Sequence, residues 1–518
     1  MFFNKDSSQC YRLTSQKFSF TVFNMKSSRR LSALKILTAL FFFTTLSIQI
    51  SAQAKLPSFE PLFIININST TYTADEVFET ALLYSECERN SEVWKRCWQK
   101  FKTIKQTLTS EEYQNLAEEE RGRAILKYLY GDYLKAYELN QTRLDVALET
   151  GKYNCVSSAI LYMAAAKAAG LTVRGQRTTQ HAFCSIYVPG AKPGQVKKID
   201  VETTNPYGFN PGSKEEVENE NKIKQYYVVP KKYYSNRAEV SDGIFTGLIA
   251  GNLTSEYIKS GNYEKALPLG AARWNAIKDE PAKSTASVRN EFDILATNYV
   301  NLLPQSAAAY SPTLDWFLEF INRWGSTEFL QKNLDTAVIN LFILCFQEKN
   351  YPLAQSAYEK YISEISQSQQ ITKAEEIITD IIITNATENL TTEEKIAQTN
   401  NLLATEDLST PARQKRAQMY LESFWLESLN DLMNSRDYEN GYATAAQALS
   451  QLPKSSKIKT MQNGFYNNCI TVIHNNFARL ANSGDYEQAL SILEEGLQKF
   501  PNNKTLKKDL TDLQKISN

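Results

Sequence analysis

One turn pattern occurs four times in the second half of the chain. Its copies are SGNYEKAL (260–267), EKNYPLAQSAY (348–358), SRDYENGYATAAQAL (435–449) and SGDYEQALSILEEGL (483–497). Each copy has a small or polar turn, then a tyrosine, then a small residue three positions later. This order is typical of a chain that leaves one helix, turns and enters the next. Because such hairpins cannot bury their apolar faces alone, we expect them to pack on one another.

The last two copies carry a further signal. A proline follows the tyrosine by fifteen residues in each, at Pro453 and Pro501. Turn, aromatic, small residues and terminal proline together resemble the tetratricopeptide repeat. The four tyrosines are spaced more widely than its period of about 34 residues, so we expect further hairpins near 300–325 and 390–410. The resemblance implies an α-solenoid over residues 231–518 that binds a protein or peptide partner; a generic helical bundle is the alternative.

The N-terminus reads as a targeting segment. MKSSRRLSALKILTALFFFTTLSIQISAQA has a basic start, an apolar run from Ile36 to Ile50 and the small-residue pattern Ala52-Gln53-Ala54. This is typical of a cleaved signal peptide. We expect a signal peptide over 1–54, with Met25 as the true start, and a mature protein in the periplasm or outside the cell. If the segment is not cleaved, residues 31–50 would instead anchor the protein in the membrane.

The composition indicates the fold class and argues against two functions, nucleic-acid binding and zinc binding. Glycine and proline number only 19 and 15 in 518 residues, which favours a mostly α-helical chain. Basic and acidic residues balance at 57 each, so the chain lacks the broad positive charge that nucleic-acid binding requires. Two histidines and no C-x-x-C motif make a zinc site improbable. We therefore expect no cofactor and no metal.

Residues 55–125 follow the signal segment with an extended lead-in and then helical periodicity. Residues 126–230 differ, because a short β region interrupts the helices there. LTVRGQR, HAFCSIYV and QVKKIDVETT alternate in polarity and read as three strands, with PGAKPG as a turn. An alanine-rich helix from Cys155 to Ala169, ended by Gly170, precedes them. We expect a small α+β domain in which this helix packs on an antiparallel sheet.

Cys155 lies at the start of that helix. The positive end of the helix dipole and the unbonded N–H groups there favour a thiolate, the reactive form of cysteine. The same N–H groups suit the oxyanion of a tetrahedral intermediate. Cys155 is therefore the candidate nucleophile. Cys184, within a strand, reads as a buried apolar group.

His181 begins the strand that returns beside the helix, where it could serve Cys155 as base and then acid. Asp200 lies on the next strand. If the hairpin turns near Pro189 and Gly190, residues 181 and 200 face each other, and the carboxylate would orient the imidazole. The other histidine, His474, lies in a repeat helix and reads as a packing or surface residue.

Helix-borne cysteine, strand-borne histidine and next-strand aspartate resemble the transglutaminase-like superfamily of papain-fold cysteine enzymes. The stretch YELNQTRLDVALETGKYNCVSSAILYMAAAKAAGL is similar to its SirB1-like bacterial branch. The resemblance implies Cys155 as nucleophile, His181 as base and Asp200 as orienting residue. It also implies a polar oxyanion helper upstream, for which Asn140 and Gln141 are the candidates. Glu202 is a rival to Asp200.

Two functions follow from these patterns. The first is an exported amide hydrolase or acyltransferase that uses Cys155 and holds a protein or peptide through its repeats. The second is an inactive scaffold in which the repeats bind a partner. Two further questions stay open: whether Cys87 and Cys97 form a disulfide, and whether Tyr207 and Phe209 line a cleft or only cap the domain.

Overall fold

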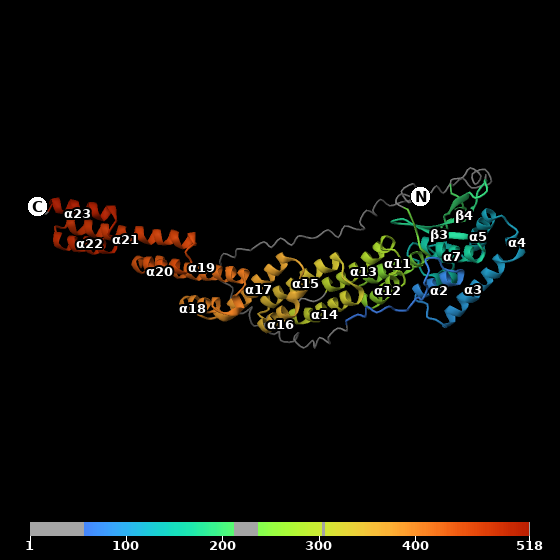
Figure 1. Ribbon diagram of the computed structural model, residues 1–518, viewed down its shortest axis with the longest axis horizontal. Coiled ribbons are helices and arrows are strands. Elements are labelled where there is room, and N and C mark those ends of the chain that lie inside the picture. The colour runs from blue at the N-terminus through green and yellow to red at the C-terminus, as the bar shows by residue number, and fades with distance from the viewer. Residues whose placement is uncertain (1–55, 212–236, 303–305, 517–518) are drawn as a thin grey trace, which may run out of the picture. The chain divides into compact units, whose positions relative to one another are not determined.

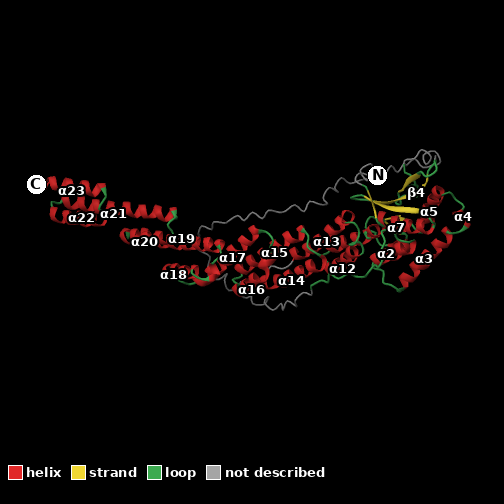
Figure 2. Cartoon of the chain, in the orientation of Figure 1, coloured by secondary structure: helices red, strands yellow, loops and turns green. Residues whose placement is uncertain are grey.

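The computed structural model describes residues 56–211, 237–302 and 306–516 (Figure 1). Within these residues the chain is mostly helical with small sheets, which confirms the expected class (Figure 2). The expected signal peptide and the alternative anchor lie outside the described residues, as does the expected domain end at residue 230. The predictions on export therefore stay predictions.

Four helices open the described chain: α2 (Ala74–Tyr84), α3 (Glu92–Leu108), α4 (Glu111–Gln114) and α5 (Glu118–Asp132). Polar side chains fix the starts of the first two. Thr73 and Glu76 cap α2 reciprocally, each side chain bonding the other residue's backbone N–H. Ser91 accepts from the N–H of Trp94 at the start of α3. Each of these bonds satisfies a donor that has no acceptor within its helix.

Three short elements then lead to the cysteine helix. They are β1 (Ala136–Tyr137), α6 (Leu144–Thr150) and β2 (Lys152–Tyr153), and β1 pairs with β2 in parallel. Gly151 ends α6 in the left-handed conformation that favours glycine. The next helix, α7 (Cys155–Ala168), is followed by Gly170, also at positive φ. The expected helix and its glycine stop are confirmed.

Helix α7 has no solvent-facing side over most of its length. Every residue from Val156 to Ala166 is buried. Helices α2, α3, α5 and α6 pack against it, as do strands β3 and β4. Its many alanines permit this close approach from several sides. The helix that carries Cys155 is therefore a central element, and only Cys155 at its start and Lys167 and Ala168 at its end are partly exposed.

The larger sheet contains β3 (Thr172–Arg177), β4 (Ala182–Pro189), β5 (Val196–Val201) and β6 (Ala238–Val240). Its order is β5-β4-β3-β6, and all neighbours are antiparallel. The three strands expected from the sequence are confirmed, and β6 is an addition. Cys184 of β4 is buried and its thiol donates to the carbonyl of Ala159 on α7. The expected packing of the helix on an antiparallel sheet is thus observed.

One hydrophobic core joins the first helices, α7 and the sheet. Its buried members run from Tyr72 through Phe78, Ile125 and Tyr162 to Leu269. The core therefore crosses the sequence boundary expected at 125/126, and residues 74–132 pack against the cysteine helix instead of forming a separate layer. The extended lead-in reaches further still, because the indole Nε1 of Trp316 donates to the carbonyl of Pro57.

Helices fill the rest of the described chain. They are α10 (Asp242–Thr246), α11 (Leu248–Lys259), α12 (Tyr263–Asn275), α13 (Ala282–Leu302), α14 (Ala307–Trp324), α15 (Glu328–Gln347), α16 (Tyr351–Tyr361), α17 (Ser368–Thr387), α18 (Thr392–Leu403), α19 (Pro411–Asn434), α20 (Tyr438–Gln451), α21 (Ser456–Asn482), α22 (Tyr486–Lys499) and α23 (Lys504–Ile516), with 3₁₀ turns η1 (Ile362–Glu364) and η2 (Glu406–Leu408). Successive helices pack as neighbours, and α15, α17 and α19 also contact one another in sequence.

The four turn patterns have one shared geometry. The residue before each tyrosine caps the following helix, and these residues are Asn262, Asn350, Asp437 and Asp485. Their φ angles lie between −88° and −84° and their ψ angles between 67° and 72°. Two positions before each tyrosine the chain takes a positive φ, at a glycine, lysine or arginine. The expected helix–turn–helix geometry is observed at all four turns, and α13 with α14 and α18 with α19 form hairpins in the two stretches, 300–325 and 390–410, where further hairpins were expected.

Helix α15 is long and apolar enough to cross a membrane by composition, and among the described helices it alone passes that test. Half of its most apolar window is buried inside the protein. Leu334, Leu341 and Phe342 belong to the core of the helical region. The apolar character of α15 is thus explained by packing between hairpins.

Candidate functional site

Cys155 is the first residue of α7 and is the one described cysteine that is not buried. The side chain of Asn154 caps the helix and accepts from the N–H groups of Val156 and Ser157. Ser157 returns a bond to the backbone N–H of Asn154. A residue at the first helical position has no intrahelical acceptor for its own N–H. The cap therefore holds the thiol and its backbone N–H in a fixed, partly exposed position.

The segment that follows β1 braces this helix start. The amide of Asn154 donates to the carbonyl of Leu139, and the hydroxyl of Ser157 donates to the carbonyl of Gln141. Both bonds tie residues 139–141 to the first turn of α7. The upstream strand thus lies beside Cys155, where the sequence placed the oxyanion helper.

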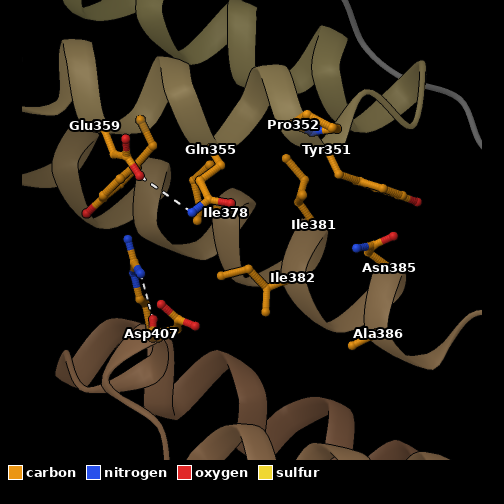
Figure 3. A pocket seen from close by; sticks show the side chains of 12 residues that line it. Tyr351, Pro352, Gln355, Glu359, Ile378, Ile381, Ile382, Asn385, Ala386 and Asp407 are labelled. Carbon is orange, nitrogen blue, oxygen red and sulfur yellow. Dashed lines mark hydrogen bonds between the residues drawn. The ribbon is translucent and has the colours of Figure 1, made fainter.

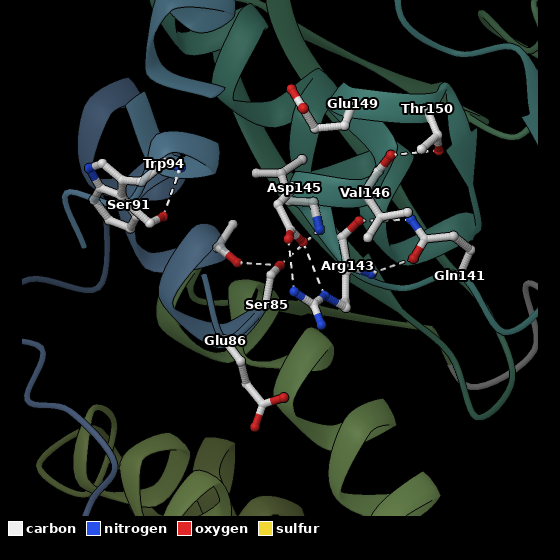
Figure 4. Close-up of polar contacts among 12 residues, drawn as sticks. Ser85, Glu86, Ser91, Trp94, Gln141, Arg143, Asp145, Val146, Glu149 and Thr150 are labelled. Carbon is white, nitrogen blue, oxygen red and sulfur yellow. Dashed lines mark hydrogen bonds and ion pairs between the residues drawn. The ribbon is translucent and has the colours of Figure 1, made fainter. Parts of the chain in front are cut away.

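Gln141 is not available for that role. Its amide nitrogen donates to the carbonyls of Arg143 and Lys152, and its amide oxygen accepts from the N–H of Arg143 (Figure 4). Figure 4 also shows the Arg143–Asp145 ion pair beside it, which anchors α6. Asn140 is exposed and borders a shallow depression with Glu138, Leu139 and Gln141. Gln141 is therefore a structural residue, and no contact joins Asn140 to Cys155 among the described residues.

His181 lies in the tight turn between β3 and β4. Its carbonyl accepts from the N–H and the hydroxyl of Thr178, which closes the turn. Its imidazole stacks near the ring of Phe183, with centroids 6.0 Å apart. The side chain is 14% exposed and hydrogen bonds with Cys155. The expected meeting of Cys155 and His181 is observed.

Glu202, and not Asp200, is the carboxylate against His181. The Nε2 atom of His181 lies 2.5 Å from Oε2 of Glu202. Because this bond occupies Nε2, we assign the hydrogen bond with Cys155 to Nδ1, the other ring nitrogen. The prediction for Asp200 was wrong because the register differs: Ser185 faces Asp200, and the loop between β4 and β5 spans residues 190–195.

Asp200 has other partners on the same face of the sheet. Its carboxylate accepts from the hydroxyl of Ser185 at 2.7 Å and pairs with Arg237 at 2.6 Å. It lies two residues before Glu202, on the side of the sheet that Glu202 also uses. Asp200 therefore belongs to a polar cluster next to the site and does not contact the imidazole.

The backbone around Glu202 is built to hold that side chain. Its second oxygen, Oε1, accepts from the N–H and the hydroxyl of Thr204. Its own N–H donates to the carbonyl of Gly208. A Cβ at Gly208 would lie 1.9 Å from the carbonyl oxygen of Glu202, so only glycine fits there. Glu202 is 1% exposed, and both of its oxygens have partners.

The charge state of His181 follows from these neighbours. Burial lowers the pKa of His181, but hydrogen bonds with Cys155 and Glu202 and the charge of Glu202 outweigh it and raise the pKa to about 10. The site thus favours an imidazolium at neutral pH. An imidazolium beside a cysteine stabilises the thiolate, which is the nucleophilic form.

Two tyrosines that the sequence did not single out connect the parts of the site. The hydroxyl of Tyr130 lies 2.9 Å from that of Tyr153 and donates to the carbonyl of Thr203. Tyr153 precedes Cys155 by two residues and Thr203 follows Glu202. Ser158 and Thr203 also share a bond between their hydroxyls. In the sequence these tyrosines look like core residues, so no pattern could have assigned them to the site.

The remaining candidates lie elsewhere. His474 of α21 pairs with Asp509 of α23 at 2.7 Å, a packing role as expected. Cys87 lies in the connection between α2 and α3, Cys97 lies in α3, and both are free and buried. Burial and the nearby Cys87 raise the pKa of Cys97 to about 12. The sequence left their pairing open, and the structure has both thiols unpaired.

The aromatic residues after Glu202 differ in burial. Phe209 is buried against Gly122, whereas Tyr207 is 45% exposed. Within residues 56–211, 237–302 and 306–516, no cluster of three or more His, Cys, Asp or Glu residues has the arrangement of a metal site. Comparison of the chain with family models, with curated proteins and with solved structures gave no match, so the contacts of Cys155, His181 and Glu202 themselves carry the functional argument.

Proposed function

We propose that this protein is an exported cysteine-dependent amide hydrolase or acyltransferase of transglutaminase-like type, with helical repeats that bind a protein or peptide. The observation that carries the proposal is the continuous chain of contacts from Cys155 through His181 to Glu202. Cysteine, imidazole and carboxylate in that order make an activated nucleophile with an oriented base. Two of its members match the residues that the resemblance implies, and Glu202 takes the place of Asp200.

The first half of the reaction forms an acyl-enzyme. With His181 an imidazolium at neutral pH, the thiol proton of Cys155 already lies on Nδ1 in the resting site, and the thiolate attacks the amide carbonyl carbon. The backbone N–H of Cys155, at the positive end of α7, stabilises the oxyanion. The imidazolium then gives its proton to the leaving nitrogen, the C–N bond breaks, and a thioester remains on Cys155.

The second half restores the thiolate and the imidazolium. His181 takes a proton from water or from an amine, which attacks the thioester carbonyl carbon. The C–S bond breaks, the acyl group leaves as an acid or a new amide, and the sulfur leaves as the thiolate beside the protonated His181. Glu202 keeps Nε2 protonated throughout, so that Nδ1 always faces the reacting sulfur.

An acylation experiment tests the proposal. The full chain is treated with p-nitrophenyl acetate, and the acetylated residue is located by peptide mass mapping. We expect acetylation at Cys155, and we expect His181→Ala to abolish it while circular dichroism shows an intact fold. A folded protein without a modified Cys155 would contradict the enzyme and favour the alternative, an inactive scaffold with partner-binding repeats.

A further inference from the structure

A cavity of about 610 Å³ lies in the helical region, far along the chain from Cys155. Residues of α16, α17, η2 and α19 line it. Figure 3 shows Ile378, Ile381 and Ile382 along its wall, with Tyr351 and Asp407 on opposite sides of them. This volume is in the range of sites that hold small ligands or peptide ends. An apolar wall with a few polar groups at its ends is also typical of such sites.

Arg413 brings a guanidinium group with an unbonded N–H to the cavity. It is only 9% exposed and its guanidinium stacks 4.4 Å from the ring centroid of Tyr358. Nη1 donates to the backbone carbonyl of Asp407 at 2.6 Å. Nε is buried without an acceptor, and no carboxylate of the described residues forms an ion pair with Arg413. A buried guanidinium with an unbonded N–H group is unfavourable, so Arg413 favours an anionic acceptor although two acidic residues line the same cavity.

A neighbouring arginine on α19 differs from Arg413, because a carboxylate binds its guanidinium group. Arg416 lies three residues later and forms two bonds with the carboxylate of Asp380, at 2.6 and 2.8 Å. This is the paired geometry that guanidinium and carboxylate prefer. Arg413 offers the same edge, Nε and Nη2, and no bond to Nη2 is found within the described chain. The vacant edge fits a carboxylate.

The other polar groups narrow the class of ligand. The hydroxyl of Tyr351 is buried and has no hydrogen-bond partner among the described residues. The acidic residues Glu359 and Asp407 also line the cavity. Their charges disfavour a polyanion such as phosphate, and their oxygens accept from N–H groups. A ligand with one carboxylate, adjacent N–H groups and an apolar side chain fits the arginine, the acidic residues and the isoleucine wall of the cavity.

We propose that this cavity binds the C-terminal end of a peptide whose last residue is apolar. The terminal carboxylate pairs with Arg413, the apolar side chain packs on Ile378, Ile381 and Ile382, and the peptide N–H groups face the acidic residues. The partner of the helical region would thus be a protein or peptide with a free, apolar C-terminal residue. It does not depend on chemistry at Cys155, so a failed acylation experiment leaves it intact.

Fluorescence anisotropy with the full chain tests this inference. The probe is a fluorescein-labelled hexapeptide that ends in leucine with a free carboxylate, and its matched control is the same peptide with a C-terminal amide. We expect the acid to bind and the amide to bind at least about tenfold more weakly, because a hydrogen bond to a charged group is lost. Equal affinity of acid and amide, or no binding of the acid, would overturn the proposal.

Variants locate the binding to this cavity. Arg413→Gln should weaken the acid peptide to the level of the amide, whereas Arg416→Gln, the control on the same helix, should leave binding unchanged. Tyr351→Phe is a second variant that keeps the packing; it removes a hydroxyl with no partner in the described chain, so thermal stability should hold while affinity falls severalfold. If Arg413→Gln folds and binds normally, or if laurate displaces the peptide completely from wild type, the assignment is wrong.

Discussion

The Nε2 atom of His181 and the Oε2 atom of Glu202 lie 2.5 Å apart, while Asp200, two residues earlier on the same side of the sheet, pairs with Arg237. Of these two acidic side chains, Glu202 bonds the imidazole, and Asp200 bonds Ser185 and Arg237 instead. Because only Glu202 bonds the imidazole, a substitution at Asp200 serves as the control for the same substitution at Glu202.

Glu202→Gln should slow alkylation of Cys155 by iodoacetamide at neutral pH by about tenfold or more, since the imidazolium loses its charged partner. Asp200→Asn should change the rate by less than about threefold, since Asp200 does not contact the imidazole. The rate is measured by mass spectrometry of the Cys155 peptide. A larger effect at Asp200 than at Glu202 would contradict the assignment.

The stability of the protein should depend on the charge of His181. Its pKa is about 10 in the folded chain against an ordinary 6.5, so the protonated form is stabilised by folding. This contribution is fully present below about pH 6.5 and is lost as the pH rises toward 10. The free energy of unfolding of wild type and of His181→Gln, measured from pH 6 to about pH 10, should therefore converge with rising pH. A constant difference would show that the charge is not involved.

Gly208→Ala should disrupt the backbone that holds Glu202. Its Cβ would collide with the Glu202 carbonyl, so the loop must move. We expect a loss of about 1–3 kcal/mol in unfolding free energy and a lower alkylation rate at Cys155. Gly131→Ala is the control, because a Cβ there meets nothing within 4 Å and the residue lies in α5. That change should stabilise the helix by about 0.5–1 kcal/mol.

Tyr130→Phe removes the hydroxyl that joins Tyr153 to Thr203. We expect a loss of about 1 kcal/mol in stability, typical of one buried hydrogen bond, and a severalfold lower alkylation rate at Cys155. Tyr128→Phe is the matched control on the same helix, since its hydroxyl bonds with Thr107 and Tyr133 and with no residue of the site. If both variants behave alike, the hydroxyl of Tyr130 does not position the site.

The sequence predicted the elements of the site better than their register. Cys155 at a helix start, His181 before a strand and three strands in order are all observed, because caps, glycines and alternation are local signals. The pairing of 181 with 200 was wrong by four positions in the partner strand. A slip by an even number leaves every side chain on the same face. Alternation therefore could not distinguish Asp200 from Glu202, and only the length of the 190–195 loop decides it.

In the helical region too, the sequence predicted local features but not the contacts between distant elements. The residue before each repeated tyrosine caps a helix as the pattern indicates, because a cap depends on three neighbouring residues. The cavity around Arg413 was not predictable, since its walls come from four elements between 351 and 413. No spacing in the sequence identifies which arginine lacks a carboxylate.

The burial of α7 on nearly every side limits how the protein can be divided. A fragment that begins at residue 126 would lack Val77, Phe78 and Phe101, and the apolar surface of the cysteine helix would be open to water. Because α11 also contacts α7, a fragment cut before Leu248 would expose it again. The smallest piece able to hold the thiol in place thus begins ahead of Ala74 and continues beyond Lys259.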